Sequence, residues 1–454
     1  MPTATTIPSP ATAAAAAATA VAATVTAAGE AKGPDLFKPL YKRDRGLQTS
    51  APGSLPAAIT DPRLPVAELN ANPSIPYTFR TQPYRLQRDR HDDADCQAEA
   101  KDIVSGEVDI RHAMDQIFRE HGFLDDEEEE SKNSSNEDSS SGDARSAIDD
   151  TPIQVLTIDE LPGAAIIPGF LSVAVQARLV ELVVEELIGD PRHKSNLDAH
   201  YLDPQTLLAQ LFSGPNSPAS SQAKSQKQPQ EQAPALELAP RDPAVHAPLS
   251  LAAVRDKKLR WITLGGQYNW TTKIYPSFTR TDPAFPQFPP RVAALFSPPL
   301  FAVRPEAAIV NFYSQGDVLS PHQDVAEKCG ADLISLSVGC DAIFYIGLDR
   351  YAPAAPTNDN DNEKTIPNND TTNNDSNTKG TADPCQETPR PPLQVLLRSG
   401  DILIMGGAAR FAYHGVGRVF RDTAPPALVA SVHPRYRAWL TTKRINLNVR
   451  QMLV

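Results

Sequence analysis

The triplet His322-Gln323-Asp324 holds the residues best suited to chemistry in this sequence. On an extended segment, side chains two positions apart point to the same face, so the imidazole and the carboxylate can grip one metal ion. A second histidine from a distant strand would complete a two-histidine, one-carboxylate site. Such a site leaves positions on Fe(II) open for a cosubstrate and for oxygen. With nine histidines in the chain, a surface histidine beside a solvated aspartate is the simpler alternative.

A second candidate is the segment 444–450, in which polar and apolar residues alternate. As a strand it would place Arg444, Asn446, Asn448 and Arg450 on one face and Ile445, Leu447 and Val449 on the other. One alternative is an edge strand with its polar face in water. The other is an interior position, where the two guanidiniums form bidentate pairs with the carboxylates of a small diacid. Two inward arginines would be costly without an anionic ligand.

Short β-rich runs predict the strands that must position these residues. They cover 307–313, 333–338, 342–346, 395–397, 402–405 and 445–449. The residues Ser399-Gly400-Asp401 predict a hairpin turn between two of these strands. Upstream, 164–167 is a short apolar run, and 171–188 has a helical period with Ser172 as N-cap. Helices followed by many short strands predict an α+β fold with a double-stranded β-helix core, a cupin-like jelly roll supported by N-terminal helices.

The 454 residues exceed one such domain, and composition assigns the excess to segments that cannot form a core. The 43 prolines are about twice the average usage. We predict a disordered Ala/Thr/Pro-rich tail at 1–35, an N-terminal extension at 36–124, an acidic and Ser-rich linker at 125–151 and one folded domain at 152–454. Within that domain we expect disordered insertions at 214–248 and 352–390.

The net charge of −12 at first disfavours a nucleic-acid partner. However, 125–150 has eleven acidic and two basic residues, and 352–390 has seven and three. Residues 391–454, in contrast, have nine basic and two acidic residues, so the end of the fold is basic. No apolar run approaches the roughly 18 residues that span a bilayer, which excludes an integral membrane protein. Four cysteines without CxxC spacing favour a reducing compartment.

Together, these motifs resemble the AlkB family of iron- and 2-oxoglutarate-dependent nucleic-acid dioxygenases. The matching order is Asn311-Phe312-Tyr313, Gly316, His322-Gln323-Asp324, 335–339, Ala342-Ile343-Phe344, 399–405, Tyr413-His414-Gly415 and 444–450. Four further segments resemble the eukaryotic AlkB homologue 1 branch in particular: 259–265, Tyr268-Asn269-Trp270, Asp35-Leu36-Phe37 and Tyr41-Lys42. The resemblance covers roughly 152–190, 255–350 and 391–454.

The resemblance implies roles for particular residues, with no catalytic side chain beyond the metal centre. His322, Asp324 and His414 would bind Fe(II), and Asn311, Tyr313, Arg444, Asn446 and Arg450 would hold 2-oxoglutarate, with Arg444 opposite its distal carboxylate. Trp261, Tyr268 and Trp270 would lie in a nucleotide-recognition lid and Arg350 at the rim of the substrate cleft. A core position is the alternative for the aromatic residues, because stacking on an extruded base requires an exposed ring. Asn448 replaces a threonine common in this motif, a change we expect to be tolerated.

His433 is a rival for the third metal ligand, because it precedes Arg444 by only eleven residues. We favour His414, which matches the family motif directly. Its long separation from Asp324 is explained by the predicted insertion between them. Position 326 is Ala where some family members carry an acid that contacts the base, and the neighbouring Glu327 either substitutes for that acid or faces solvent.

The implied reaction uses Fe(II), 2-oxoglutarate and O2 to hydroxylate an N-methyl group on a base. The hydroxymethyl group then leaves as formaldehyde, and the unmodified base remains. The expected substrate is N1-methyladenine in tRNA or methylated bases in DNA. The alternatives are an oxygenase acting on a protein side chain and a catalytically silent nucleic-acid-binding module. We expect a monomer without membrane partners, located in the nucleus and/or cytoplasm. The mitochondrion is a further alternative, although there is no clear transit peptide.

Overall fold

The computed structural model describes residues 33–51, 53–86, 107–125, 153–212, 236–269, 275, 279–352 and 389–453. Most of the predicted tail and linker, most of the insertion at 352–390 and residues 214–235 of the other insertion lie outside this set, as does Trp270. Within the described ranges, no helix has the length and apolar character needed to cross a membrane.

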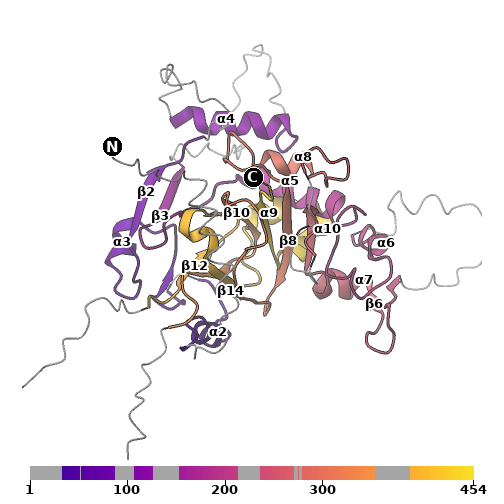
Figure 1. The fold of residues 1–454 in the computed structure, drawn as a ribbon, viewed down its shortest axis with the longest axis horizontal. Coiled ribbons are helices and arrows are strands. Elements are labelled where there is room, and N and C mark those ends of the chain that lie inside the picture. The colour runs from indigo at the N-terminus through magenta and orange to yellow at the C-terminus, as the bar shows by residue number, and fades with distance from the viewer. Residues whose placement is uncertain are drawn as a thin grey trace, which may run out of the picture.

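Two large β-sheets form the core of the fold, which confirms the predicted α+β jelly roll (Figure 1). The eight-stranded sheet has the order β2 (Phe79–Pro83), β3 (Gln154–Ile158), β4 (Ala164–Ile167), β13 (Ile402–Met405), β10 (Leu333–Gly339), β15 (Lys443–Arg450), β8 (Ala307–Ser314) and β7 (Trp261–Gly265). The five-stranded sheet has the order β1 (Ile59–Thr60), β12 (Leu393–Leu397), β11 (Ala342–Gly347), β14 (Tyr413–Val419) and β9 (Leu319–His322). Buried side chains of both sheets share one apolar cluster, so the sheets pack face to face.

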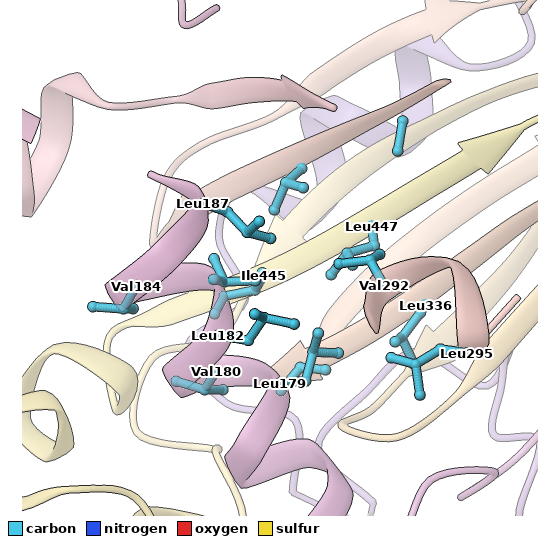
Figure 2. Close-up of a cluster of buried hydrophobic side chains, with 14 of the residues drawn as sticks. Leu179, Val180, Leu182, Val184, Leu187, Val292, Leu295, Leu336, Ile445 and Leu447 are labelled. Carbon is cyan, nitrogen blue, oxygen red and sulfur yellow. The ribbon is translucent and has the colours of Figure 1, made fainter. Parts of the chain in front are cut away.

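Helices cover the other face of the eight-stranded sheet (Figure 2). The predicted helix at 171–188 consists of α5 (Val173–Leu182) and a π-helical turn, η1 (Val183–Leu187). It begins at Ser172, whose hydroxyl accepts a hydrogen bond from the Val175 amide, as the N-cap prediction requires. Its buried leucines and valines pack on Leu336, Ile445 and Leu447 of strands β10 and β15. Burial of one such leucine stabilises the fold by about 2 kcal/mol.

Strand β15 lies in the middle of its sheet, between β10 and β8, so the edge-strand alternative is wrong. Its apolar residues join the helix-covered core, whereas its polar residues face the five-stranded sheet. The alternation in the sequence therefore reflects two buried faces of β15, one in an apolar and one in a polar environment, rather than one face in the core and one in solvent. Arg444 and Arg450 are both buried.

In the described part of the chain, the other helices are α2 (Lys38–Asp44), α3 (Val66–Ala71), α4 (Glu107–Glu120), α6 (Pro204–Leu208), α7 (Leu251–Ala253), η3 (Val254–Lys258), α8 (Pro290–Ala294), η4 (Gly407–Phe411), α9 (Pro426–Ser431) and α10 (Pro434–Leu440). Strands β5 (Glu237–Leu238) and β6 (Leu249–Ser250) pair with each other. Residues 236–248 therefore have hydrogen-bonded structure, contrary to the disorder expected there. The described residues between 36 and 86 are also integrated into the fold, since β1 pairs with β12 and β2 with β3.

The prediction of a hairpin at Ser399-Gly400-Asp401 is wrong, because the strands on either side belong to different sheets. Strand β12 ends in the five-stranded sheet and β13 begins in the eight-stranded one. The turn itself exists, with Gly400 at a φ of +85°. Its backbone bonds to β10 rather than closing a hairpin, since Gly400 N–H donates to Ser337 O and Ser337 N–H donates to Asp401 O.

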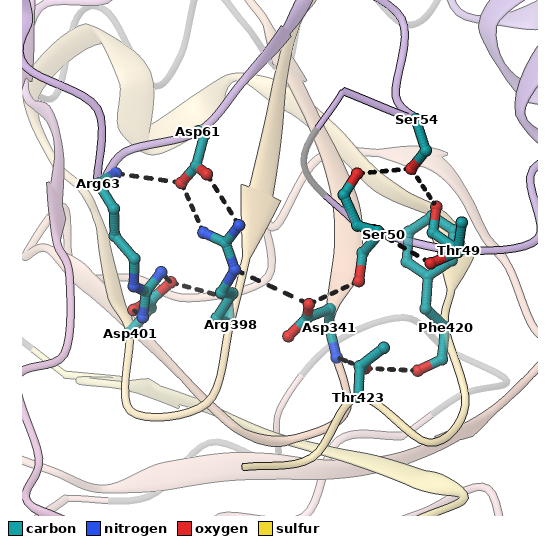
Figure 3. Close-up of polar contacts among 11 residues, drawn as sticks. Thr49, Ser50, Ser54, Asp61, Arg63, Asp341, Arg398, Asp401, Phe420 and Thr423 are labelled. Carbon is teal, nitrogen blue, oxygen red and sulfur yellow. Dashed lines mark hydrogen bonds and ion pairs between the residues drawn. The ribbon is translucent and has the colours of Figure 1, made fainter.

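A buried polar network secures this crossing between the sheets (Figure 3). The Asp401 carboxylate is fully buried and accepts two hydrogen bonds from the Arg63 guanidinium, at 3.0 and 2.7 Å. It also accepts the backbone N–H groups of Gly169 and Arg398, at 2.9 and 2.7 Å. Burial raises the pKa of Asp401, and the Arg63 guanidinium opposes this rise. The pair adds little net stability, but removal of one partner would leave a buried charge unpaired, which is costly.

The substitution Asp401→Asn is expected to lower the free energy of unfolding by about 3 kcal/mol. An amide nitrogen in place of one carboxylate oxygen would face N–H donors instead of accepting from them. Chemical denaturation measures the effect. The matched control is Asp159→Asn, which removes the exposed ion pair with Arg80 and should cost much less. Equal losses in the two variants would contradict the assigned role of Asp401.

Candidate metal and cosubstrate site

The structure brings His322, Asp324 and His414 together between the two sheets. Strand β9 ends at His322, which pairs with His414 on the neighbouring strand β14, and Asp324 follows two residues later. One ligand atom from each of the three residues lies within 4.8 Å of the others. The Asp324 carboxylate is 3.7 Å from His322 Nε2 and 3.9 Å from His414 Nε2.

Backbone carbonyls orient both imidazoles toward this common point. Nδ1 of His322 lies 3.0 Å from Ser320 O, and Nδ1 of His414 lies 3.1 Å from Ala412 O. A carbonyl can only accept, so each Nδ1 carries the proton and each Nε2 presents a lone pair. Burial, followed by the proximity of His322, lowers the pKa of His414 to about 4, which keeps this ring neutral at neutral pH.

The Asp324 carboxylate is held in its charged form by neighbouring donors. Burial alone would raise its pKa, but the Arg450 guanidinium and the two imidazoles bring the pKa well below its usual range. Arg450 Nη2 lies 3.2 Å from Oδ2, and Asn448 Nδ2 donates to the same oxygen at 3.1 Å. Asn448 is therefore more than a tolerated replacement for threonine, because it contacts a predicted metal ligand directly.

A buried ionic chain continues behind Asp324. Glu327 lies 2.9 Å from Arg450 Nη1 and 2.9 Å from Arg410 Nη2, and its side chain is fully buried. Neither expectation for Glu327 holds, because both carboxylate oxygens are occupied by arginines and solvent does not reach them. Arg410 was not identified from the sequence. The signal was a lone charge in the otherwise small and apolar run 406–412.

Arg444 defines the other end of the site. Its Nη2 donates to the Ser337 hydroxyl at 2.8 Å, and its guanidinium lies over the Tyr313 ring. Nε and Nη1 are buried with no hydrogen-bond partner, and among the described residues no carboxylate lies within ion-pair distance. A buried guanidinium with free donors requires an anion. Arg444 therefore fits the distal carboxylate of 2-oxoglutarate, and the metal triad fits the opposite end of this cosubstrate.

One cavity of about 730 Å³ connects these two ends. Its lining includes the predicted residues Asn311, Tyr313, Asn446 and Arg450 as well as the metal triad and Arg444. Asn446 is fixed by Ser335, whose hydroxyl accepts from its Nδ2 at 2.8 Å. Burial raises the pKa of Tyr313 to about 12, so its phenol is neutral and can donate a hydrogen bond. Ser335 and Ser337 belong to the stretch 335–339 that resembles the family, but no role was assigned to them, although they alternate with apolar residues along β10.

Two of the four predicted substrate residues line the same cavity. Trp261 begins strand β7 and is half-buried, and Tyr268 lies beyond the end of that strand, so both combine an exposed surface with contact to the cavity. Trp270 lies outside the described residues. Arg350 is not among the residues that line the cavity, and its place at the rim of the substrate cleft stays a prediction. It pairs with Asp35 and donates to the carbonyl of Pro321, a residue of the cavity wall.

His433 lies apart from the metal triad. It is the N-cap of α10, where its Nδ1 accepts the Arg435 backbone N–H at 3.3 Å. The geometry therefore favours His414 over His433 as the third ligand, because His414 and not His433 shares a cluster with His322 and Asp324.

Comparisons with known proteins agree with this geometry. The sequence profile described as the 2OG-Fe(II) oxygenase superfamily matches residues 206–450. A Pyricularia oryzae protein named N6-methyladenosine RNA demethylase ALKB1 is 34% identical over 68% of this chain and 78% of its own length. A Cryphonectria parasitica protein named N6-methyladenosine RNA demethylase ALKBH is 38% identical over 47% and 84%, respectively. The Schizosaccharomyces pombe protein named tRNA demethylase abh1 is 30% identical over 66% and 82%.

A jelly roll with a His-Asp-His triad and an unpaired arginine in one cavity defines an iron- and 2-oxoglutarate-dependent oxygenase. The chain belongs to the 2OG-Fe(II) oxygenase superfamily, and it uses Fe(II), 2-oxoglutarate and O2. Within the superfamily it is an enzyme of the AlkB homologue 1 type.

Proposed function

We propose that this enzyme removes N-methyl groups from nucleic-acid bases by oxidative demethylation. The observation that carries the proposal is the single cavity that joins the metal triad, the unpaired Arg444 and the aromatic side chains of Trp261 and Tyr268. The aromatic rings offer a surface on which an extruded base can stack. The printed names of the relatives, which are RNA and tRNA demethylases, support a nucleic-acid substrate.

The side chains of this enzyme have positioning roles in that reaction. Bound Fe(II), together with 2-oxoglutarate and O2, supplies the oxidation that converts the N-methyl group to N-hydroxymethyl. Arg444, which Ser337 orients, would bind the distal carboxylate, and Arg450 and Asn448 hold the carboxylate of Asp324 in place. The hydroxymethyl product loses formaldehyde by itself, so no side chain has to act as a general base.

For the substrate class we propose methylated adenine in RNA, with methylated DNA bases as the second candidate. The first two relatives are named for N6-methyladenosine and the third for tRNA, and N1-methyladenine in tRNA remains the form expected from the sequence. The cavity wall beside the metal triad carries Val325 and Ala326, which offer no charge to a methylated base. On this side of the cavity, shape rather than charge would therefore select the base.

Formaldehyde and succinate release should be measured with four substrates in parallel. These are RNA with N6-methyladenosine, tRNA with N1-methyladenine, methylated DNA and a methylated histone peptide. Turnover with one of the RNAs is expected, and turnover with the peptide alone would contradict the proposal. The variant Trp261→Ala should raise the KM for the nucleic acid about 10-fold, because stacking on one base is worth 1 to 3 kcal/mol. Its KM for 2-oxoglutarate should change little.

We also propose that the protein acts as a monomer, without membrane partners, in the nucleus and/or cytoplasm. One chain supplies every residue of the metal and cosubstrate site, which supports the monomer. The described cysteines, Cys329 and Cys340, are free thiols, which is compatible with a reducing compartment. Light scattering on the purified protein and fractionation of cells that express it would test these two proposals.

A further inference from the structure

The pairing between strands β9 and β14 is irregular at the metal triad. His322 pairs with His414 and Leu319 with Val416, so two residues of β9, Ser320 and Pro321, lie opposite one residue of β14. Such a bulge re-aims the side chains beside it and disrupts the local ladder of hydrogen bonds. The position of His322 relative to His414 therefore depends on whatever fixes the backbone of this bulge.

Two side chains from outside the strand pair hold the bulge. The Tyr41 hydroxyl donates a hydrogen bond to the carbonyl of Leu319, and Arg350 Nη1 donates to the carbonyl of Pro321 at 3.3 Å. These two carbonyls lie on either side of Ser320, whose own carbonyl orients the His322 ring. The bulge backbone is thus bonded on both sides of the carbonyl that aligns a metal-binding imidazole.

Both donors are anchored by the N-terminal segment 34–44. Tyr41 is on helix α2, which begins after Asp35, and Asp35 Oδ1 accepts the backbone N–H groups of Phe37 and Lys38. The other oxygen of Asp35 lies 3.2 Å from Arg350 Nε. Two backbone hydrogen bonds join the same regions, from Leu36 N–H to Arg350 O at 2.8 Å and from Ala352 N–H to Pro34 O at 2.9 Å.

The sequence of β14 shows how closely this segment approaches the metal triad. A Cβ at Gly415, the residue after His414, would collide with the Tyr41 hydroxyl and the Leu319 carbonyl. A Cβ at Gly417 would collide with Tyr345, whose hydroxyl is bonded to Asp44 at the end of α2. The Tyr41 and Tyr345 rings meet edge to face at 4.9 Å. Helix α2 therefore packs directly on the outer face of the strand that carries His414, below β14 in Figure 1.

We infer that the 34–44 segment is a positioning element for the metal site, with Tyr41 and the Asp35–Arg350 pair as its positioning residues. None of the three lines the cavity; Tyr41 and Arg350 bond to the backbone of the cavity-wall residues Leu319 and Pro321. They act through the β9 bulge, by setting the distance and orientation of His322 relative to His414. The inference rests on the metal chemistry of the proposed function and is independent of the substrate.

Metal titration of the full-length protein tests this inference. The variant Tyr41→Phe removes one hydroxyl and keeps the ring on Tyr345, and Asp35→Asn keeps the oxygen that opens α2 but loses the charge opposite Arg350. The matched control is Tyr77→Phe, because the Tyr77 hydroxyl also donates to a backbone carbonyl, that of Pro391, away from any metal ligand. Calorimetry with Mn²⁺ under anaerobic conditions gives the affinity, and the melting temperature without metal reports the fold.

Tyr41→Phe and Asp35→Asn are each expected to weaken Mn²⁺ binding by about 3- to 10-fold. This is no more than the smallest effect of removing a direct outer-shell contact, because both residues act on His322 only through the backbone of the bulge. Tyr77→Phe should leave the affinity unchanged, with a metal-free melting temperature close to that of Tyr41→Phe. Equal Mn²⁺ affinity in Tyr41→Phe and Tyr77→Phe would overturn the inference. If Tyr41→Phe does not fold, Asp35→Asn decides by the same comparison. Absence of Mn²⁺ binding in the unmodified protein would instead count against the metal site itself.

Discussion

Replacing Arg444 with alanine is expected to raise the KM for 2-oxoglutarate about 30-fold or more. The guanidinium is buried, two of its nitrogens have no partner, and it lies at the closed end of the cavity opposite the metal triad. Loss of one partner of a buried charge pair costs about 2 to 5 kcal/mol in binding, which corresponds to roughly 30- to several-thousand-fold. Arg444→Lys should recover part of this loss, since it keeps the charge but not the fork that binds a carboxylate with two hydrogen bonds. Succinate release at varied 2-oxoglutarate concentration gives the KM.

Replacement of Arg444 should have the opposite effect on the stability of the protein without cosubstrate. A buried guanidinium without a carboxylate partner is a cost to the fold, and burial lowers the pKa of Arg444 accordingly. Arg444→Met should therefore unfold at the same or a higher denaturant concentration than the unmodified protein, and 2-oxoglutarate should no longer stabilise it. Arg418→Met is the control, because Arg418 is also a buried arginine but bonds to the Arg45 carbonyl and does not line the cavity. An unchanged KM in Arg444→Ala would show that the cosubstrate binds elsewhere.

Local sequence patterns were sufficient to predict the strands and the polar face of β15. The alternation at 444–450 places its arginines and asparagines on one face whatever the strand pairs with. The pattern could not distinguish an edge strand from a central one, since both have two chemically different faces. That choice is made by β8 and β10 on either side, which bury Arg444 and Arg450 and turn a polar face into a cosubstrate site.

Local sequence patterns could not predict contacts across long sequence separations, and His414 was grouped with His322 and Asp324 only through the family resemblance. Arg350 was placed at the substrate cleft, yet its partner Asp35 is 315 positions away and no local pattern links the two. Glu327 follows Asp324 outside any regular element, so no periodicity indicates that it points to Arg410 and Arg450. The turn at Ser399 has hairpin chemistry, but which sheet the chain enters next is decided by packing of the two sheets rather than by turn residues.

The metal triad carries the second large expected effect. Asp324→Asn and His414→Ala should each weaken Fe(II) binding at least about 100-fold and abolish turnover, since even outer-shell contacts are worth 10- to 100-fold. Asp324 is central, because its oxygens lie within 4 Å of both imidazoles and also bind Arg450 and Asn448. Anaerobic Fe(II) titration and formaldehyde release measure binding and turnover, respectively.

The control for the metal prediction is His433→Ala, which tests the rival that sequence spacing alone could not exclude. His433 caps α10 through the Arg435 amide, so its removal should cost about 1 kcal/mol of stability and leave Fe(II) affinity intact. The two histidines thus differ in which quantity they change: His414 governs metal affinity, because its Nε2 faces Asp324, and His433 governs the start of a helix. Weakened Fe(II) binding in His433→Ala with normal binding in His414→Ala would reverse the assignment and require a different metal site.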